Sequence, residues 1–219
     1  MTSTTQTRVS RHRRVNPWHV VMIVIVLLAL VTRLVALGDR AVRHDETTHA
    51  KYGWNLYTGR GFRHDPLMHG PLLFEATAFF YALFGVSDFS ARLYAALAGV
   101  ALVASPWLLR RWLGRLGALL ASVMLLISPA ITYYSRYTRH DVPILLFVTL
   151  LLWSVLSYLA HRKRGQRWLI WMGIFFALAY ATKENAYIYT AIFLGLWALP
   201  LLWRVVRTPW QRPRLSALA

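Results

Sequence analysis

Six long apolar runs constrain the fold of this chain more than any other feature of its sequence. A helix that crosses a bilayer needs about 20 apolar residues, with roughly 17 as a practical lower limit. The runs lie at residues 18–37, 89–109, 116–134, 142–160, 168–182 and 186–203. Together they leave no room in 219 residues for a separate soluble domain. They predict an all-α, polytopic integral membrane helix bundle with six transmembrane helices.

The charges are segregated along the chain. With 25 Lys and Arg against 8 Asp and Glu, the composition would suit nucleic-acid binding in a soluble protein. Four basic clusters contain no acid: residues 8–14, 110–115, 162–167 and 204–214. All the acids lie in the other connections: Asp39, Asp45, Glu46, Asp65, Glu75, Asp88, Asp141 and Glu184. Because excess Lys and Arg marks cytoplasmic loops, the charge reports topology, and no nucleic-acid partner is expected.

The charge pattern predicts a multi-pass protein of the plasma membrane with both termini in the cytoplasm. The expected parts are a basic tail at 1–17, a membrane module at 18–203 and a second basic tail at 204–219. The first run is too long for a signal peptide and is interpreted as a retained anchor. The acidic connections, expected outside, are residues 38–88, 135–141 and 183–185. The absence of cysteine excludes disulfides and thiol chemistry.

The first outer loop is expected to contain one or two helices that lie in the membrane interface. Residues 70–85 are apolar, but a crossing here would place the basic cluster 110–115 outside and Glu75 at membrane depth, which is costly. The segment therefore fits an amphipathic or half-inserted helix. Residues 46–59 are aromatic, end at a Gly turn and predict a second short helix at the headgroup level.

The tripeptide Arg-His-Asp occurs three times, at 43–45, 63–65 and 139–141. All three copies fall on the predicted outer face, where a folded bundle could bring them to one pocket. Asp45 and Glu46 are adjacent, so on a helix they point about 100° apart. One is expected to face a reaction pocket as a general base with a raised pKa, while the other pairs with Arg43 or Lys51. The alternative is a solvated loop whose charges balance one another.

Two further charged groups lie at predicted helix mouths. Asp141 precedes Val-Pro in the first turn of a helix, where the helix dipole favours an acid. Its neighbours Arg136 and Arg139 carry planar guanidinium groups that suit an anionic headgroup or a sugar phosphate. Lys183 fits either a phosphate partner or an ion pair between helices. Arg92 is expected to pair with Asp88 at the i, i+4 spacing.

The first outer loop is also a candidate metal site, because His44, His49, His64 and His69 lie there with acids between them. The string HDETTH is not the HExxH zinc motif, since its histidines are five residues apart. Glu46 and His49 have the Glu-x-x-His spacing of di-iron bundles, but that spacing occurs once here instead of twice. A divalent cation such as Mg²⁺ or Mn²⁺ held by carboxylates is favoured over a transition metal.

An ordered set of short motifs then resembles the N-terminal membrane module of the GT-C superfamily of polyprenyl-phosphate-sugar glycosyltransferases, over residues 18–203. The motifs are Asp45-Glu46, His69-Gly70-Pro71-Leu72, Phe84-Gly85, Ser90-Ala91-Arg92-Leu93, Arg136 to Asp141 and Thr182-Lys183-Glu184. Within the superfamily, the chain is most similar to the flippase-activity-associated proteins of archaeal and bacterial glycosylation clusters. Protein mannosyltransferases and aminoarabinose transferases are also similar.

The resemblance implies sugar transfer from a polyprenyl-phosphate donor to an acceptor hydroxyl on the outer face, with membrane lipid around the site. It implies catalytic roles for Asp45, with Glu46 beside it, and for Asp141. Donor phosphate would be bound by Lys183, Arg136 and Arg139, with Arg43 or His69 as helpers. Relatives usually carry further helices after this module. The chain is therefore expected to be a truncated form, a natural half that needs a partner subunit to supply C-terminal parts, or a module that has lost catalysis. The alternative is a non-catalytic, flippase-associated subunit that binds lipid-linked sugars.

Overall fold

The computed structural model describes residues 16–62, 68–161 and 165–207, and these residues form helices and no strand. The elements are α1 (Pro17–Leu34), α2 (His44–Tyr57), α3 (Leu72–Phe84), α4 (Asp88–Ala104), the 3₁₀ helix η2 (Ser105–Leu109), α5 (Arg110–Ile127), α6 (Pro129–Ser135), α7 (Asp141–Ala160), α8 (Gln166–Thr182) and α9 (Asn185–Arg207). Predicted features at 8–14, at His64 and Asp65, and in most of both tails lie outside the described residues.

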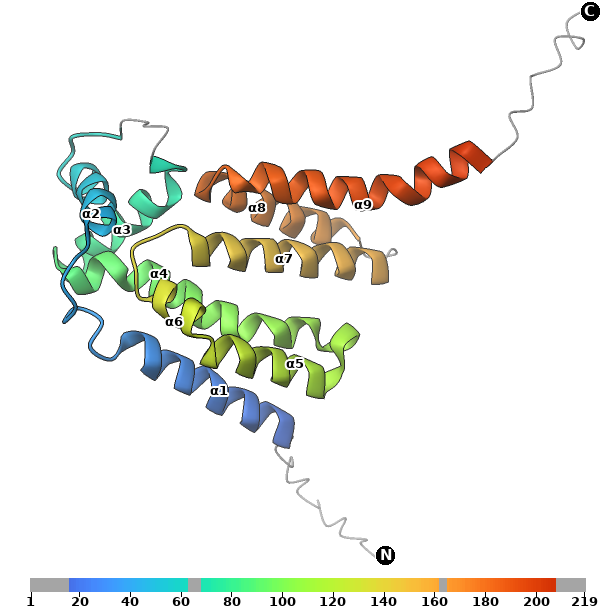
Figure 1. Ribbon diagram of the computed structural model, residues 1–219, viewed down its shortest axis with the longest axis horizontal. Helices are drawn as coiled ribbons and strands as arrows, with labels where there is room; N and C mark the ends of the chain where they lie inside the picture. The colour runs from blue at the N-terminus through green and yellow to red at the C-terminus, as the bar shows by residue number, and fades with distance from the viewer. Residues whose placement is uncertain (1–15, 63–67, 162–164, 208–219) are drawn as a thin grey trace, which may run out of the picture.

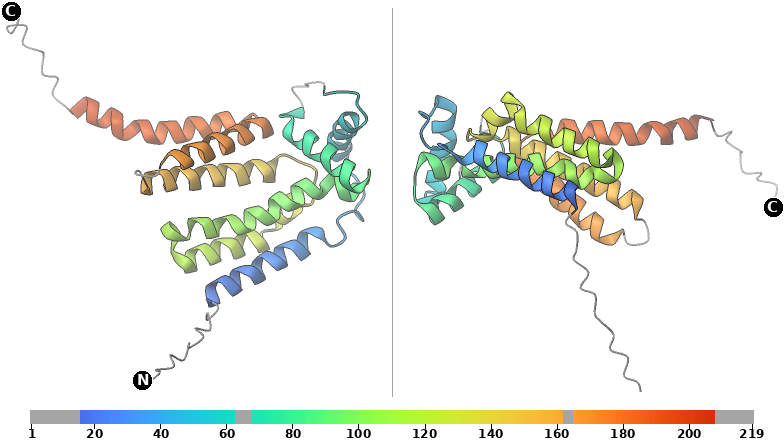
Figure 2. Two further views of the ribbon diagram at one scale, coloured as in Figure 1. Left: turned by 180° about the vertical axis from the view of Figure 1, so that it is seen from behind. Right: turned by 90° about the horizontal axis from the view of Figure 1, so that it is seen from below.

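The long helices run side by side, and the short helices α2 and α3 gather across one end of the bundle (Figure 1). We call this the α2–α3 end. The turn from α4 into α5, the end of α7 and the start of α8 lie together at the opposite end, the α4–α5 end, as both views in Figure 2 also show. The acidic and the basic connections are therefore separated along the bundle.

The all-α membrane bundle is confirmed. Four stretches are long and apolar enough to cross a membrane: Pro17–Leu34, Asp88–Ile127, Asp141–Ala160 and Asn185–Arg207. The second stretch contains α4, η2 and α5, which reverse direction so that α4 and α5 lie antiparallel (Figure 1). Each of the six predicted runs is mainly helical, and their number as membrane crossings stays a prediction.

Helix α4 forms the centre of the bundle because its buried face is made of small residues. Ala95, Ala96 and Gly99 on this face are buried. Small side chains let neighbouring helices approach closely. Such close packing matters in a bilayer, because the hydrophobic effect does not drive helices together there. At Gly99, an added Cβ would overlap the side chain of Ser135 in α6. Apolar clusters extend from α4 to α1 and α5 on one side and to α7 on the other.

The two helices predicted in the first outer loop are present as α2 and α3. Gly53 of α2 meets Thr77 of α3 so closely that an added Cβ would lie 2.7 Å from the Thr77 Cγ2 atom. Glu75 is exposed in the first turn of α3. Their position at a bilayer surface stays a prediction.

The prediction of one continuous helix over 116–134 is wrong, because the chain breaks between α5 and α6. Ser128 has extended dihedrals, and Pro129 begins α6. A proline has no N–H and its ring displaces the preceding turn, while the residue before it avoids the helical region. The Leu125 carbonyl, which would have accepted from residue 129, accepts instead from the buried Arg33 Nη2 at 3.2 Å.

Candidate functional site

A chain of alternating acidic and basic side chains lies at the α2–α3 end, where α7 begins and α8 ends. The Asp45 carboxylate contacts Arg139 Nη2 at 3.1 Å, and Arg139 Nε lies 3.9 Å from the Asp141 carboxylate. Asp141 in turn accepts a 2.7 Å hydrogen bond from Lys183 Nζ. The fold thus brings three separate sequence regions into one cluster. Asp45 is half exposed, with a fractional exposure of 50%.

Glu46, although adjacent to Asp45, is buried and saturated with hydrogen bonds. Its two carboxylate oxygens accept from Arg92 Nε and Nη2 at 2.9 and 3.0 Å, which is a bidentate ion pair. Arg40 Nη2 and the backbone N–H of Thr138 also donate to it, both at 3.2 Å. The predicted pairing of the acidic doublet with Arg43 or Lys51 side chains, and that of Arg92 with Asp88, are both wrong.

The position of Glu46 in α2 explains this difference between neighbours. Glu46 is the third residue of the helix and also accepts from the backbone N–H of Arg43, at 3.4 Å, as in a capping box. Burial alone would raise the pKa of the Glu46 carboxyl, but Arg92 and the N–H groups of Thr138 and Arg43 hold that pKa below its usual value. Glu46 therefore stays ionised and ties α2, α4 and the segment before α7 together.

The motifs around His69 and Lys183 meet in space. The backbone N–H of Gly70 donates to the Thr182 carbonyl at 3.3 Å, and His69 Nδ1 lies 2.7 Å from the Glu184 carboxylate. Gly70 permits this approach, because an added Cβ would overlap the carbonyl of Ala181. The contact holds the end of α8, and with it Lys183, against the start of α3.

Three histidine rings pack together behind the ionic cluster. His140 is buried, with its ring centroid 5.2 Å from that of His49 and 5.3 Å from that of His69. Its Nε2 donates to the Gly70 carbonyl at 3.3 Å. Burial, and then the charge of His49, lower the pKa of His140 to about 3. Burial likewise lowers the pKa of His49, so both rings are neutral at physiological pH.

Basic and aromatic side chains line the surface beside Asp45. The Arg43 guanidinium lies over the Tyr133 ring at 5.9 Å, and that of Arg139 lies over Tyr137 at 5.8 Å. Arg136 is placed differently: its guanidinium donates to the carbonyls of Thr32, Val35 and Ala36 at the end of α1. A cation at a helix C-terminus satisfies free carbonyls and the helix dipole, so the geometry favours capping by Arg136.

The described residues contain no group of three or more His, Cys, Asp or Glu side chains placed to hold a metal ion. Asp45 and Asp141 each contact a basic side chain instead. The predicted Mg²⁺ or Mn²⁺ stays a prediction without a ligand set in this part of the chain.

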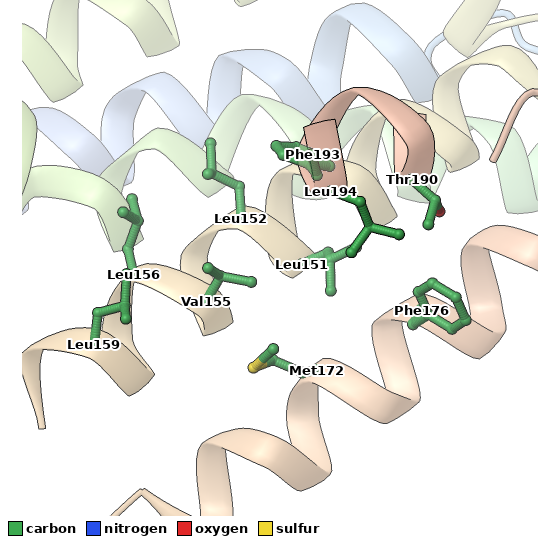
Figure 3. Close-up of a pocket in the computed structure, with 10 residues that line it drawn as sticks. All are labelled: Leu151, Leu152, Val155, Leu156, Leu159, Met172, Phe176, Thr190, Phe193 and Leu194. Atoms are coloured by element: carbon green, nitrogen blue, oxygen red, sulfur yellow. The ribbon is translucent and has the colours of Figure 1, made fainter. Parts of the chain in front are cut away.

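An apolar groove of about 310 Å³ lies between α7, α8 and α9. Figure 3 shows side chains from the three helices arranged around it, including Leu151, Phe176 and Leu194. Near its α2–α3 end, the Tyr180 hydroxyl donates to Thr190 at 3.0 Å. Phe176 and Thr190 each lie seven residues from Lys183, which corresponds to roughly 10 Å along a helix.

Sequence reasoning selected Asp45, Asp141, Arg139 and Lys183, and the fold brings these four together. It missed the structural role of Arg40 and the buried position of His140. Arg92 was part of a motif, yet its partner was sought within the same helix. His140 belongs to the third Arg-His-Asp copy, but only its charged neighbours Arg139 and Asp141 were predicted as site residues.

Comparison with known proteins shows a family match for this chain. Residues 68–219 match the model of the dolichyl-phosphate-mannose-protein mannosyltransferase family. No curated protein sequence matches the chain.

Three solved structures share the fold. ArnT from Cupriavidus metallidurans in the apo state has a TM-score of 0.74 at 22% identity, over 88% of this chain and 38% of ArnT. The same ArnT bound to undecaprenyl phosphate gives 0.71 at 22% identity, over 87% of this chain and 37% of ArnT. The S. cerevisiae protein O-mannosyltransferase Pmt1-Pmt2 complex bound to the sugar donor gives 0.67 at 16% identity, over 92% of this chain and 30% of the matched chain. The present chain therefore spans less than two fifths of each.

Proposed function

Because the chain belongs to the dolichyl-phosphate-mannose-protein mannosyltransferase family, we propose that it transfers a sugar from a polyprenyl-phosphate donor to an acceptor hydroxyl at its α2–α3 end. The observation that carries the proposal is the ionic cluster of Asp45, Arg139, Asp141 and Lys183. It combines a half-exposed carboxylate with two cations, and Lys183 lies roughly two helical turns from the lining of an apolar groove. We further propose that this end faces the outside of the cell.

Asp45 is the candidate general base. Its carboxylate takes the proton of the acceptor hydroxyl while the hydroxyl oxygen attacks the anomeric carbon of the donor. The bond from that carbon to the phosphate oxygen breaks, its electron pair leaves with the phosphate, and the configuration inverts. Glu46 cannot share this role, because it is 1% exposed and its oxygens accept from Arg92 and Arg40.

The leaving phosphate gains negative charge, and pre-placed cations stabilise such a charge where water is scarce. Arg139 and Lys183 are the candidate phosphate ligands, with Arg43 and His69 beside them. On donor binding, the phosphate replaces Asp45 as the partner of Arg139 and Asp141 as the partner of Lys183. Asp141 holds Lys183 in position until then, through its 2.7 Å hydrogen bond.

The groove between α7, α8 and α9 supports the proposal of a lipid-linked donor. Its walls are apolar, and its residues Phe176 and Thr190 lie roughly two helical turns from Lys183. The prenyl chain of the donor occupies it, with the phosphate at the ionic cluster. Undecaprenyl phosphate, which one ArnT structure contains, is therefore a suitable probe for this chain.

The test uses the full chain reconstituted in liposomes with radiolabelled polyprenyl-phosphate mannose and a hydroxyl acceptor peptide. Asp45→Asn is expected to lower the transfer rate by 10²–10⁴-fold, the usual contribution of a general base, while retaining undecaprenyl phosphate binding. Lys183→Met is expected to weaken that binding.

Asp39→Asn is the matched control, because Asp39 is exposed on the same loop and makes no ion pair with any described residue. It should transfer sugar at the wild-type rate. Normal transfer by the Asp45→Asn protein would refute the catalytic assignment. Retained lipid binding without turnover in the wild type would favour a non-catalytic subunit that binds lipid-linked sugars.

A further inference from the structure

The α4–α5 end of the bundle carries a second pocket, far from the ionic cluster and of opposite character. It has a volume of about 490 Å³ and lies where η2 turns into α5, beside the end of α7 and the start of α8. Three arginines line it, Arg110, Arg111 and Arg115, together with His161 and several tryptophans. Figure 1 shows the α4–α5 turn and the end of α7 adjacent at this end.

The structure places no acidic counter-ion from the described residues beside these arginines. The sequence contains no acid between Asp88 and Asp141, and none between Asp141 and Glu184. Those three acids all lie at the α2–α3 end (Figure 1). Among the described residues, no carboxylate pairs with any of the three arginines.

His161 and Arg111 both line the pocket and contact each other. The Nδ1 atom of His161 lies 3.0 Å from the Ser157 carbonyl, which can only accept, so Nδ1 carries the proton. Its Nε2 lies 3.0 Å from Arg111 Nη1, which can only donate, so Nε2 offers its lone pair. In this arrangement the imidazole holds one N–H group of Arg111, and the other N–H groups of Arg111 point to no carboxylate among the described residues.

Trp168 contributes an unsatisfied donor. Its ring stacks on His161 at 6.1 Å and meets Trp153 edge-on at 5.1 Å. The indole Nε1–H is buried and has no hydrogen-bond partner among the described residues. A buried donor without a partner is costly, and an acceptor ligand in the pocket would satisfy it.

We infer that this pocket is a binding site for a phosphate group, the headgroup phosphate of an anionic lipid or a free phosphate ion. Guanidinium forks match phosphate oxygens, and basic pockets between transmembrane helices on the cytoplasmic side bind anionic headgroups. The positive-inside rule accounts for arginines at this end, but it does not account for the ordered His161 or for the buried indole donor.

Gly114 shapes the site. It lies between Arg111 and Arg115 with a φ of 72°, which breaks the helical geometry of α5, and no atom lies within 4 Å of an added Cβ. The left-handed conformation, and not crowding, requires glycine here.

The experiment measures lipid binding by the purified full chain in neutral detergent, with fluorescent phosphatidylglycerol and phosphatidylcholine as probes. Phosphatidylglycerol is expected to bind more tightly. Arg111→Gln with Arg115→Gln should weaken it roughly thirtyfold, at about fivefold for each basic residue near a headgroup. Trp168→Phe keeps the stacking and removes only the N–H, and should weaken binding about tenfold. This milder variant keeps the test valid if the double variant fails to fold.

Arg207→Gln is the control, since Arg207 lies on α9 over the Trp203 ring, outside the pocket lining. Calorimetric titration with inorganic phosphate separates the two sources: saturable binding that the double variant loses identifies a free phosphate ion. The inference is overturned if both lipids bind equally and phosphate does not bind, or if Arg207→Gln weakens binding as much as the double variant. The site lies opposite Asp45, so its failure leaves the proposed function untouched.

Discussion

At the scale of single residues, two adjacent carboxylates differ sharply in burial and in their partners. Glu46 is buried against Arg92, whereas Asp45 is half exposed. Breaking a buried pair by removing one partner leaves an uncompensated charge, which costs about 3–5 kcal/mol. Glu46→Gln should therefore lower the free energy of unfolding in mixed micelles by about this amount, whereas Asp45→Asn should change it by less than about 0.5 kcal/mol.

A combined replacement of Glu46 by Leu and Arg92 by Met is the decisive control, because an apolar pair of similar volume often restores stability. If the double variant is as unstable as Glu46→Gln alone, packing and not the ion pair explains the loss.

The buried histidines give the α2–α3 end a defined pH dependence. His140 has a pKa of about 3 in the folded protein, against about 6.5 in an unfolded chain. Between these values the unfolded state binds more protons, so stability is greatest above pH 6.5 and declines as the pH falls toward 3. The midpoint temperature of thermal unfolding should therefore fall as the pH is lowered from 6.5 toward 3.

His140→Phe should flatten the decline in stability, leaving the part that His49 contributes. An unchanged slope in His140→Phe would show that another group titrates.

At the scale of the elements, the break between α5 and α6 depends on two residues that are far apart in sequence. Arg33 supplies the hydrogen bond that Pro129 cannot give to the Leu125 carbonyl. Pro129→Ala restores an N–H at the position that this carbonyl would use in a continuous helix. Arg33→Met should therefore lower the free energy of unfolding by about 1–3 kcal/mol less in the Pro129→Ala protein than in the wild type.

Unfolding of the two single variants and the double variant measures this coupling free energy. Equal effects of Arg33→Met in both backgrounds would mean that Arg33 does not compensate for the proline.

The helices were predictable to the extent that they depend on hydropathy summed over a short stretch of sequence. Hydropathy found each apolar run, because a bilayer crossing needs only length and composition. The break at Ser128–Pro129 carried a local signal that the apolar pattern concealed. The pairs of Glu46 with Arg92 and of His69 with Glu184 had no such signal, since the residues lie 46 and 115 positions apart. Arg92 had an acid four residues away, and only the tertiary fold selects the distant one.

At the scale of the whole molecule, opposite ends of one bundle carry opposite chemistry. The α2–α3 end combines acids with bases around Asp45, and the α4–α5 end carries bases alone around Arg111. A bundle of this kind has a fixed direction in the bilayer, because Lys and Arg in short connections resist translocation. Both the proposed donor site and the proposed phosphate pocket depend on that direction.

The direction can be measured with single cysteines, because the natural chain has none. Thr58 is exposed after α2, and Gln166 is exposed at the start of α8, at opposite ends of the bundle. In intact cells, Thr58→Cys should react with a membrane-impermeant maleimide and Gln166→Cys should not, while both react after permeabilisation. The reverse labelling pattern would place Asp45 in the cytoplasm and the three arginines outside. An outer-face sugar transfer and an inner-leaflet phosphate site would then both fail, because each needs its own side of the membrane.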